Sequence, residues 1–567
     1  MHTSLRNLTR QLFIGLMTIW LLTIPAIAQN KEFSKNNQAN TEYDKYFEIA
    51  KNIDIFTTLF KELNAYYVDE VNPNKLMQEG IDAMLKSLDP YTNYIPEDEI
   101  EEYRTMTTGQ YGGIGVTVLN REGTTIVAMP YVGSPAHQAG LKVGDEIVKV
   151  DDIILQGKNT EEVSKLLKGQ AGTKVKLMVK RYGQSELLPY ELVRQNIKID
   201  NVPYYGMIGT DVGYLQLSDF TSNASLEVKN AVEKLKASGA TKIILDLRGN
   251  PGGLLNEAVN ICNLFIPRES EVVTTKAKIE EWNKVYRAYN PPLDLETPMV
   301  VLINGRSASA AEIVSGVLQD YDRAVLIGEK SFGKGLVQST RPISYNSQVK
   351  ITIAKYYIPS GRCIQAIDYS QKDENGKPIK MPDSLRRAFK TQNGRVVYDG
   401  EGLMPDIVIP KSAASAILNS LESKNLLFDY AIVYRQENAN FNEQAEAFHV
   451  SEEAYQKFVK WLSEKDYDYT TEAEKALVEL EKKAKEEKYF EAIQAELVSL
   501  KNRLSHSKEA DLQTFKKEII AALEKEIIAH YYLEKGVTQL SLRDDEDIKA
   551  ALELFKDQKR YNEILKK

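Results

Sequence analysis

The strongest constraint on the fold is a run of alternating strand-like and helix-like segments between residues 197 and 410. "TKIILDLRG" predicts a buried strand and is followed by a helical run, "LLNEAVNICNLFI". The strand-like "PMVVLIN" precedes the helical "SAAEIVSGVLQDY", and the strand-like "RAVLIGE" comes next. This alternation is typical of α/β layering. "QVKITIAKYYIPSG" then alternates in hydropathy, which predicts an antiparallel β extension of this core.

Segments of different character flank the core, because 567 residues are too many for one compact domain. Residues 43–105 carry apolar side chains at helical spacing and predict an N-terminal helical segment, in which a second helix around Leu76–Leu88 stops at Asp89-Pro90. Residues 106–196 combine short β-like runs with Gly-rich turns, which predicts a small β-barrel-like module. Residues 411–567 contain no proline and predict an all-α appendage, whose charged faces are mainly solvated surface. The predicted fold is therefore multidomain, of the α+β and α/β type.

The N-terminus has the pattern of an export signal. Arg6 and Arg10 precede an apolar run that ends in Ala26-Ile27-Ala28, a small-x-small cleavage site. We therefore expect residues 1–28 to be a signal peptide and residues 29–42 to be a polar linker. Export would place the protein in the periplasm, or otherwise outside the cytoplasm, of a bacterium. The alternative is an uncleaved anchor, which is the one membrane contact that the sequence predicts.

Charge and cysteine content exclude some classes of function. The formal net charge of −8 gives no sign of a nucleic-acid partner. With two cysteines and five histidines the chain has little material for a zinc site, and we expect no metal. An exported chain can pair Cys262 with Cys363, but both lie in apolar or strand-like runs where buried free thiols are equally expected.

A cluster of small residues, Ser307 to Ala310, lies between a predicted strand and a predicted helix and raises the question of a nucleophilic serine. A Ser-His-Asp triad is improbable because the α/β region contains no histidine. The five histidines fall in the leader, the β module and the helical tail: His2, His137, His449, His506 and His530.

A lysine is the remaining candidate for the base. "SFGK" at Ser331–Lys334 fits the S-x-x-K pattern of penicillin-binding proteins, but glycines flank the lysine and no K-T-G strand follows. A serine elsewhere, activated by a desolvated Lys334, remains open, because burial lowers the pKa of a lysine and yields the neutral amine that a base needs.

"NGRSASAAE" and "EKSFGKGLVQ" resemble motifs of the carboxy-terminal processing peptidases, also called tail-specific proteases. The resemblance implies that Ser309 is the nucleophile, that Lys334 is the base and that Gln338 orients the lysine. The family's third serine of the small-residue motif is Ala311 here, and it is not the nucleophile. "LDPYTNY" and "ILDLRGNPGG" also match the family pattern, so the resemblance covers most of the chain.

Two backbone donors are expected to bind the oxyanion. The amide of Ala310 opens a helix and has no partner within it. The second donor should come from the "NPGG" loop, where Gly253 or Gly252 allows close approach to the substrate. The alternative is that these glycines only form a tight turn. Asp246 and Arg248 are expected to hold this loop rather than to do chemistry.

"YGGIGVTV" and "SPAHQAGLKVGDEIVKVD" resemble a PDZ domain. Such domains add an extended peptide as a strand and bind its terminal carboxylate on backbone amides, here those of Gly113, Ile114 and Gly115. The combined prediction is an exported Ser/Lys endopeptidase that needs no cofactor and acts on proteins selected by their C-terminal tails. The helical tail has three open roles: dimerisation, caging of the site, or docking of an adaptor. A silent PDZ scaffold and a penicillin-binding-type acyl transferase are the alternative functions.

Overall fold

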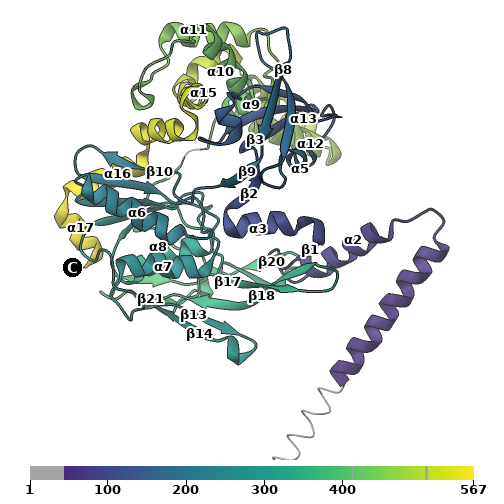
Figure 1. Ribbon diagram of the computed structural model, residues 1–567, viewed down its shortest axis with the longest axis vertical. Coiled ribbons are helices and arrows are strands. Elements are labelled where there is room, and N and C mark those ends of the chain that lie inside the picture. Colours follow the sequence, from purple (N-terminus) through teal and green to yellow (C-terminus); the bar gives the residue numbers. More distant parts are fainter. Residues whose placement is uncertain (1–43, 412, 505–507, 567) are drawn as a thin grey trace, which may run out of the picture. The chain divides into compact units, whose positions relative to one another are not determined.

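The computed structural model describes residues 44–411, 413–504 and 508–566. The predicted signal peptide, the linker, His2 and His506 lie outside these residues. The chain divides into two compact units, Met1–Ser87 and Leu88–Lys567. The described part of the first unit contains the two helices that the apolar spacing predicts, one over residues 44–66 and α2 (Pro73–Lys86) (Figure 1). Asn72 caps α2 by accepting hydrogen bonds from two backbone N–H groups.

The second unit contains the α/β core, built on a six-stranded sheet in the order β10-β11-β12-β15-β16-β23. Its strands are β10 (Tyr204–Ile208), β11 (Val212–Gln216), β12 (Lys242–Asp246), β15 (Met299–Ile303), β16 (Val325–Gly328) and β23 (Ile407–Val408). All neighbours pair in parallel except β10 and β11. The sheet and its helices confirm the predicted α/β layering.

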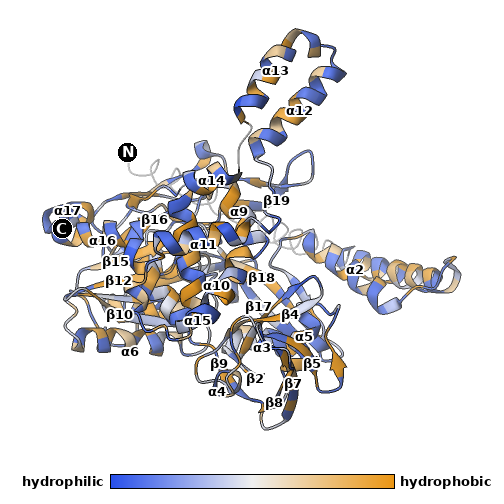
Figure 2. Cartoon of the chain, turned by 90° about the horizontal axis from the view of Figure 1, so that it is seen from above, coloured by the Kyte–Doolittle hydropathy of each residue, from blue (hydrophilic) through white to orange (hydrophobic). Residues whose placement is uncertain are grey.

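The two faces of this sheet are covered by helices from different parts of the chain (Figure 1). One face packs against α6 (Ala224–Ala237), α7 (Leu255–Phe265) and α8 (Ala310–Asp320). The other face packs against α16 (Glu546–Lys556) and α17 (Gln558–Leu565), the last two helices of the chain. Along the central strands the side chains alternate between the two cores, so these strands are apolar on both sides, and Figure 2 colours β12 and β15 mainly as hydrophobic.

An antiparallel sheet adjoins the core and confirms the predicted β extension. Its strands are β1 (Asn93–Ile95), β18 (Gln348–Tyr357), β13 (Glu271–Ala277) and β14 (Lys284–Arg287), with β17 (Leu336–Pro342) also paired to β18. Two small ribbons follow, formed by β19 (Ile367–Lys372), β20 (Pro378–Lys380), β21 (Ala388–Lys390) and β22 (Val396–Tyr398).

The β module also has the predicted character. Its main sheet is antiparallel and runs β3-β4-β5-β7-β8, with β6 paired to β5, while β2 and β9 form a separate ribbon. The helix that precedes the module is α3 (Ile100–Thr108). The strands of the module are β2 (Gln110–Gly113), β3 (Val116–Arg121), β4 (Thr124–Pro130), β5 (Glu146–Val150), β6 (Ile153–Ile154), β7 (Lys174–Lys180), β8 (Leu188–Val193) and β9 (Gln195–Lys198). Its helices are α4 (Pro135–Gln138) and α5 (Thr160–Leu167).

The C-terminal part is helical, as predicted. Five of its helices share one apolar core, namely α9 (Ala416–Ser423), α10 (Leu426–Glu437), α11 (Glu452–Leu462), α14 (Lys508–Thr514) and α15 (Lys516–Asp544). Two more, α12 (Glu472–Glu486) and α13 (Phe490–Leu504), pack against each other (Figure 2). The sequence predicts a helical C-terminal part but does not predict that α16 and α17, the last two helices of the chain, return to the peptidase sheet.

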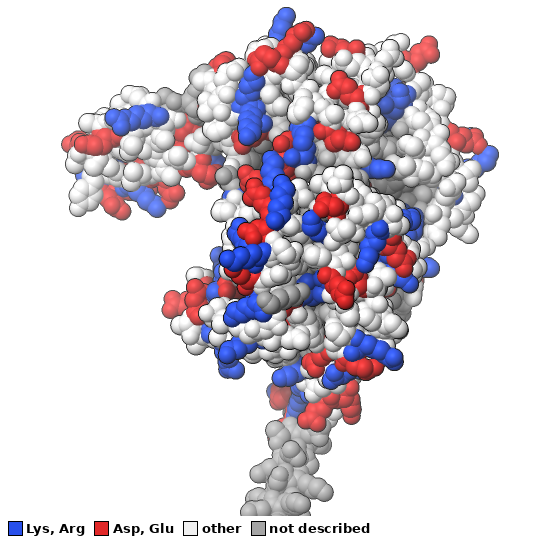
Figure 3. All heavy atoms as spheres, turned by 90° about the vertical axis from the view of Figure 1, so that its left-hand side faces the viewer, with Lys and Arg blue, Asp and Glu red and all other residues white. Residues whose placement is uncertain are grey.

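The surface carries charges of both signs. On the face drawn in Figure 3, lysines and arginines are interspersed with aspartates and glutamates. Among the described residues, no helix combines the length and the apolar character that crossing a membrane requires.

Candidate active site

Ser309 lies at the turn between β15 and α8, in a strained backbone conformation. Its φ of 55° and ψ of −115° are unusual for a residue with a side chain. Strain of this kind persists only where the surroundings enforce it, and it is common at catalytic positions. The side chain is partly exposed, whereas Ala308 and Ala310 on either side are buried. The turn therefore presents one serine out of a closely packed segment.

The glycine loop that follows β12 lies directly against this turn. A Cβ atom on Gly252 would lie 2.8 Å from the Cβ of Ser309 and 2.8 Å from the nitrogen of Ala310. A Cβ atom on Gly253 would lie 2.5 Å from the carbonyl oxygen of Phe220. Both glycines also have positive φ, at 97° and 146°. Only glycine allows the loop to approach Ser309 this closely.

The backbone N–H groups around Ser309 differ in whether they already donate a hydrogen bond within the protein. The N–H of Gly252 donates to Oδ1 of Asn250 at 2.8 Å, so this amide already has a partner. In the described ranges, the N–H groups of Ala310 and Gly253 have no protein acceptor. Of the three predicted oxyanion donors, Ala310 and Gly253 are therefore the two available in this conformation.

Lys334 lies in the loop before β17, in a largely buried position. Its Nζ is 4.3 Å from the centre of the Tyr91 ring, a cation–π contact. Burial and the nearby charge of Lys350 lower the pKa of Lys334 to about 8, although Glu312 and Asp89 act in the opposite direction. About a tenth of the lysine is therefore neutral at pH 7, in the form that a general base requires.

Glu312 connects the two segments, and the sequence interpretation did not identify it. Its carboxylate is fully buried and accepts hydrogen bonds from the N–H groups of Ser309, Gly333 and Lys334, at 2.8, 2.7 and 2.9 Å. It also accepts one from the hydroxyl of Ser331 at 2.5 Å. Burial raises the pKa of Glu312 to about 7 against these hydrogen bonds, which lower it. The sequence signal was present, because Ser-x-x-Glu at the start of a helix is a capping-box pattern.

Tyr356 on β18 is a second residue that sequence reasoning missed. Its buried hydroxyl lies 2.7 Å from the carbonyl oxygen of Lys334, to which it donates, and 3.2 Å from that of Ser309. The Tyr356 hydroxyl therefore keeps the backbone carbonyls of Ser309 and Lys334 close to each other. No local sequence pattern marks this role, because Tyr356 belongs to an ordinary alternating strand.

Gln338 lies on β17, next to a β-bulge between Val337 and Gln338. Its Nε2 donates to Oγ1 of Thr352 on the neighbouring strand at 3.2 Å. In this conformation the amide is held by the sheet, at the edge of the cavity that contains Lys334.

One cavity of about 600 Å³ brings the predicted residues together. Its lining includes all six residues predicted for the catalytic centre: Ser309, Lys334, Gln338, Ala310, Gly253 and Gly252. Among the described histidines, none lines this cavity. Burial lowers the pKa of His530 to about 3, in the core of the helical domain, so it is not poised to act as a base.

The alternatives left open by the sequence can now be compared with the geometry. Ser331 of the S-x-x-K pattern is buried and uses its hydroxyl to bind Glu312, so it does not line the cavity. Cys262 and Cys363 are both free thiols, and burial raises the pKa of each.

A second cavity, of about 230 Å³, lies in the β module between β3 and α5. Ile114 and Gly115 line it, together with apolar side chains such as Val118 and Leu167. Gly113, the third residue predicted to bind a peptide carboxylate, ends β2 and is not part of the lining.

Comparisons with known proteins agree with this architecture. The model of peptidase family S41 matches residues 211–372, and a PDZ-domain model matches residues 126–181. A model described as the probable PDZ-protease C-terminal helical domain matches residues 417–555.

The matches to named relatives extend over most of the length of each relative. A carboxy-terminal-processing protease of Bartonella bacilliformis is 35% identical over 350 residues, which are 61% of this chain and 78% of that protein. The carboxy-terminal processing protease CtpA of Bacillus subtilis is 32% identical over 339 residues, 60% of this chain and 70% of that protein. Among solved structures, the photosystem II D1 C-terminal processing protease is 28% identical, with a TM-score of 0.32, over 58% of this chain and 91% of that chain. By these sequence matches, the chain belongs to the carboxy-terminal processing proteases of peptidase family S41.

Proposed function

We propose that this serine protease uses Ser309 as its nucleophile and Lys334 as its general base, and that it is an exported endopeptidase that selects proteins by their C-terminal tails. One observation carries the assignment of the two residues. A partly exposed serine on a strained turn shares a cavity with a desolvated lysine whose pKa is about 8.

In the proposed mechanism, neutral Lys334 accepts the hydroxyl proton of Ser309 as Oγ attacks the peptide carbonyl carbon. The oxyanion accepts hydrogen bonds from the N–H groups of Ala310 and Gly253. The C–N bond then breaks, and protonated Lys334 donates its proton to the leaving amine. A water molecule, deprotonated by Lys334, hydrolyses the acyl-enzyme and restores Ser309. Gln338, which lines the same cavity, orients the lysine amine.

Tail selection is assigned to the groove of the PDZ module. A substrate tail would add to β3 as a strand, with its apolar last side chain among Val118 and Leu167. The lining of this groove and that of the catalytic cavity have Thr105, Lys168 and Ile199 in common. A bound tail therefore lies close to the catalytic cavity, which raises the local concentration of the scissile bond.

The test is digestion of an unfolded protein that ends in apolar residues, compared with the same protein ending in charged residues. Wild type should cut the first substrate faster, and Ser309→Ala and Lys334→Ala should each abolish cutting. Cleavage by Lys334→Ala at the wild-type rate would refute the proposed base. Absence of cleavage by wild type would favour a silent scaffold. For export, the expected result is a mature N-terminus near residue 29 in an extracytoplasmic fraction.

A further inference from the structure

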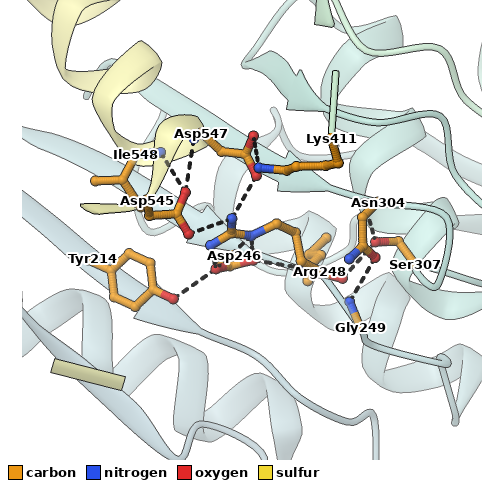
Figure 4. Close-up of polar contacts among 11 residues, drawn as sticks. Tyr214, Asp246, Arg248, Gly249, Asn304, Ser307, Lys411, Asp545, Asp547 and Ile548 are labelled. Carbon is orange, nitrogen blue, oxygen red and sulfur yellow. Dashed lines mark hydrogen bonds and ion pairs between the residues drawn. The ribbon is translucent and has the colours of Figure 1, made fainter. Parts of the chain in front are cut away.

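The C-terminal helices contact the peptidase core at Arg248 (Figure 4), in the segment that leads to the cavity-lining residues Gly252 and Gly253. Arg248 follows β12 and begins the segment of residues 248–253, called here the glycine loop, which ends in Gly252 and Gly253. Two of its three acidic partners, Asp545 and Asp547, come from the other end of the chain, at the start of α16. The contact therefore joins the helical domain to the loop that lies against Ser309.

Every nitrogen of the Arg248 guanidinium has an acidic partner. Nε and Nη2 donate to the carboxylate of Asp246, with the closest contact at 2.6 Å. Nη1 donates to Oδ2 of Asp545 at 2.7 Å and to Oδ2 of Asp547 at 2.6 Å. Asp547 is completely buried, and its other oxygen accepts from Lys411 at 3.0 Å. Asp246 and Asp547 are buried and Arg248 and Asp545 are partly buried, whereas Lys411 lies at the surface, so the inner members of this charge network are costly to replace.

Asp545 has a second role that fixes its position. Its Oδ1 accepts hydrogen bonds from the N–H groups of Asp547 and Ile548, so it is the N-cap of α16. The apolar side of α16, including Ile548, packs on the central sheet. The helix cap and the packing of α16 therefore hold the two aspartates in place independently of their contacts with Arg248.

Backbone and side-chain hydrogen bonds continue from Arg248 to the nucleophile turn. The N–H of Gly249 donates to Oδ1 of Asn304 at 2.9 Å. The Ser307 hydroxyl donates to the carbonyl of Leu247 at 2.8 Å, and the N–H of Ala308 donates to the carbonyl of Asn250 at 3.0 Å. The glycine loop is therefore held at its first residue, Arg248, by Asp545 and Asp547, and farther along by hydrogen bonds to the turn that presents Ser309.

We propose that Asp545 and Asp547 are positioning residues for the protease, which fix the glycine loop through Arg248. The proposal rests on the proposed function of Ser309 and Gly253. Glycine-containing segments have high backbone entropy and need external contacts to hold one conformation. An oxyanion donor stabilises the transition state only when it is held in place beforehand. The helical domain would thus complete the catalytic centre without touching the substrate.

The test compares Asp545→Asn, Asp547→Asn and the double variant with wild type in the full chain. Asp544→Asn is the matched control, because Asp544 is adjacent in sequence but contacts Arg543 and Lys549 at the surface instead. Asp545→Asn alone retains a residue that caps helices well, so it should fold even if the double variant does not. The measurements are kcat and KM for peptide cleavage, and hydrogen–deuterium exchange of the glycine loop in a Ser309→Ala background.

Both readouts should change in the test variants and stay constant in the control. We expect kcat to fall about 10- to 100-fold with KM within about twofold of wild type, because a small displacement of a catalytic group has effects of this size. Exchange in the glycine loop should accelerate while that of the central strands stays slow. Unchanged kcat and loop exchange in the double variant would overturn the proposal. If wild type shows no Ser309-dependent cleavage, the proposed function fails, and the exchange measurement alone decides the positioning role.

Discussion

At the scale of single residues, the site depends on a lysine whose charged form is disfavoured. The pKa of Lys334 is lowered to about 8 by burial and by Lys350, so at pH 7 roughly a tenth of the enzyme has the neutral amine. A serine without histidine can be activated in this way because desolvation takes the place of an imidazole.

The first prediction concerns the pH dependence of catalysis. We expect kcat to rise about tenfold per pH unit below pH 8 and to level off above about pH 9, because only neutral Lys334 accepts the proton of Ser309. Protonation of Glu312, whose pKa is about 7, should lower the rate further at acid pH. Initial cleavage rates from pH 6 to pH 10 at constant ionic strength measure this profile. A flat profile over that range would contradict the assignment of Lys334 as base.

The second prediction concerns the stability cost of the same lysine. The pKa of Lys334 is about 8 in the folded chain against an ordinary lysine pKa of 10.5, so the unfolded chain binds more protons between these pH values. The stability penalty is therefore complete below pH 8 and disappears as the pH rises toward 10.5. Lys334→Met should raise the free energy of unfolding by about 1–3 kcal/mol at pH 7 and by less at pH 10.

Urea unfolding at the two pH values measures this difference. Lys377→Met is the control, because Lys377 is exposed and its replacement should change stability little at either pH. An equal effect of Lys334→Met at both pH values would show that lost or gained packing, rather than charge burial, is responsible.

At the scale of elements, the site is a junction between α8 and the loop before β17. The buried carboxylate of Glu312 and the hydroxyl of Tyr356 both contact the Ser309 turn and the Lys334 loop. Neither residue has to touch the substrate to matter, because each fixes the position of the proposed nucleophile, Ser309, relative to the proposed base, Lys334.

The third prediction is that Glu312→Gln weakens the connection between the Ser309 turn at the start of α8 and the Lys334 loop before β17. Glutamine has nearly the same shape, but its NH₂ group would face N–H donors that now bind a carboxylate oxygen. We expect a loss of about 2–4 kcal/mol in the free energy of unfolding and a fall in kcat of at least about 100-fold. Chemical unfolding and cleavage kinetics measure the two effects.

The control is Glu257→Gln in α7, where the carboxylate also accepts N–H groups near a helix start but lies away from the Lys334 loop. That variant should keep the wild-type kcat. Equal losses of activity in both variants would mean that Glu312 has no special connection to the active site.

At the scale of the whole molecule, the end of the chain completes the α/β core. Helices α16 and α17 cover the second face of the central sheet, and the hydroxyl of Tyr561 exchanges hydrogen bonds with the backbone of Met299 at the start of β15. A sheet of mainly parallel strands needs helices on both faces, and here Tyr561 of the covering layer lies 262 residues from Met299 in sequence.

The fourth prediction is that Phe555→Ala in α16 destabilises the peptidase core. Phe555 is buried among apolar side chains of the sheet, and its removal should cost about 3–5 kcal/mol. Amide exchange in β12 and β15 should accelerate accordingly. Tyr489→Ala, at an exposed aromatic residue of the helical domain, should leave this exchange unchanged. Slow exchange in the Phe555 variant would show that α16 is not needed to stabilise the sheet.

Much of the site could be predicted because its signals are local. Ser309 and Lys334 lie in short motifs, and the small residues around Ser309 together with the glycines after β12 indicate a tight approach of backbone. Glu312 was missed although the capping-box pattern was visible, because the pattern explains the helix start without pointing to the Lys334 loop. Tyr356 had no signal of its own.

The sequence by itself determined the α/β character of the core, the β module and the helical C-terminal part, and it contains the motifs from which the catalytic residues are proposed. Periodicity and turn residues act over a few positions, so they are readable without a structure. Only the tertiary structure decided that α16 and α17 cover the peptidase sheet and that Asp545 and Asp547 bind Arg248. An amphipathic helix shows that one face will be buried, but the surface that buries it is chosen by packing and charge complementarity across the whole chain.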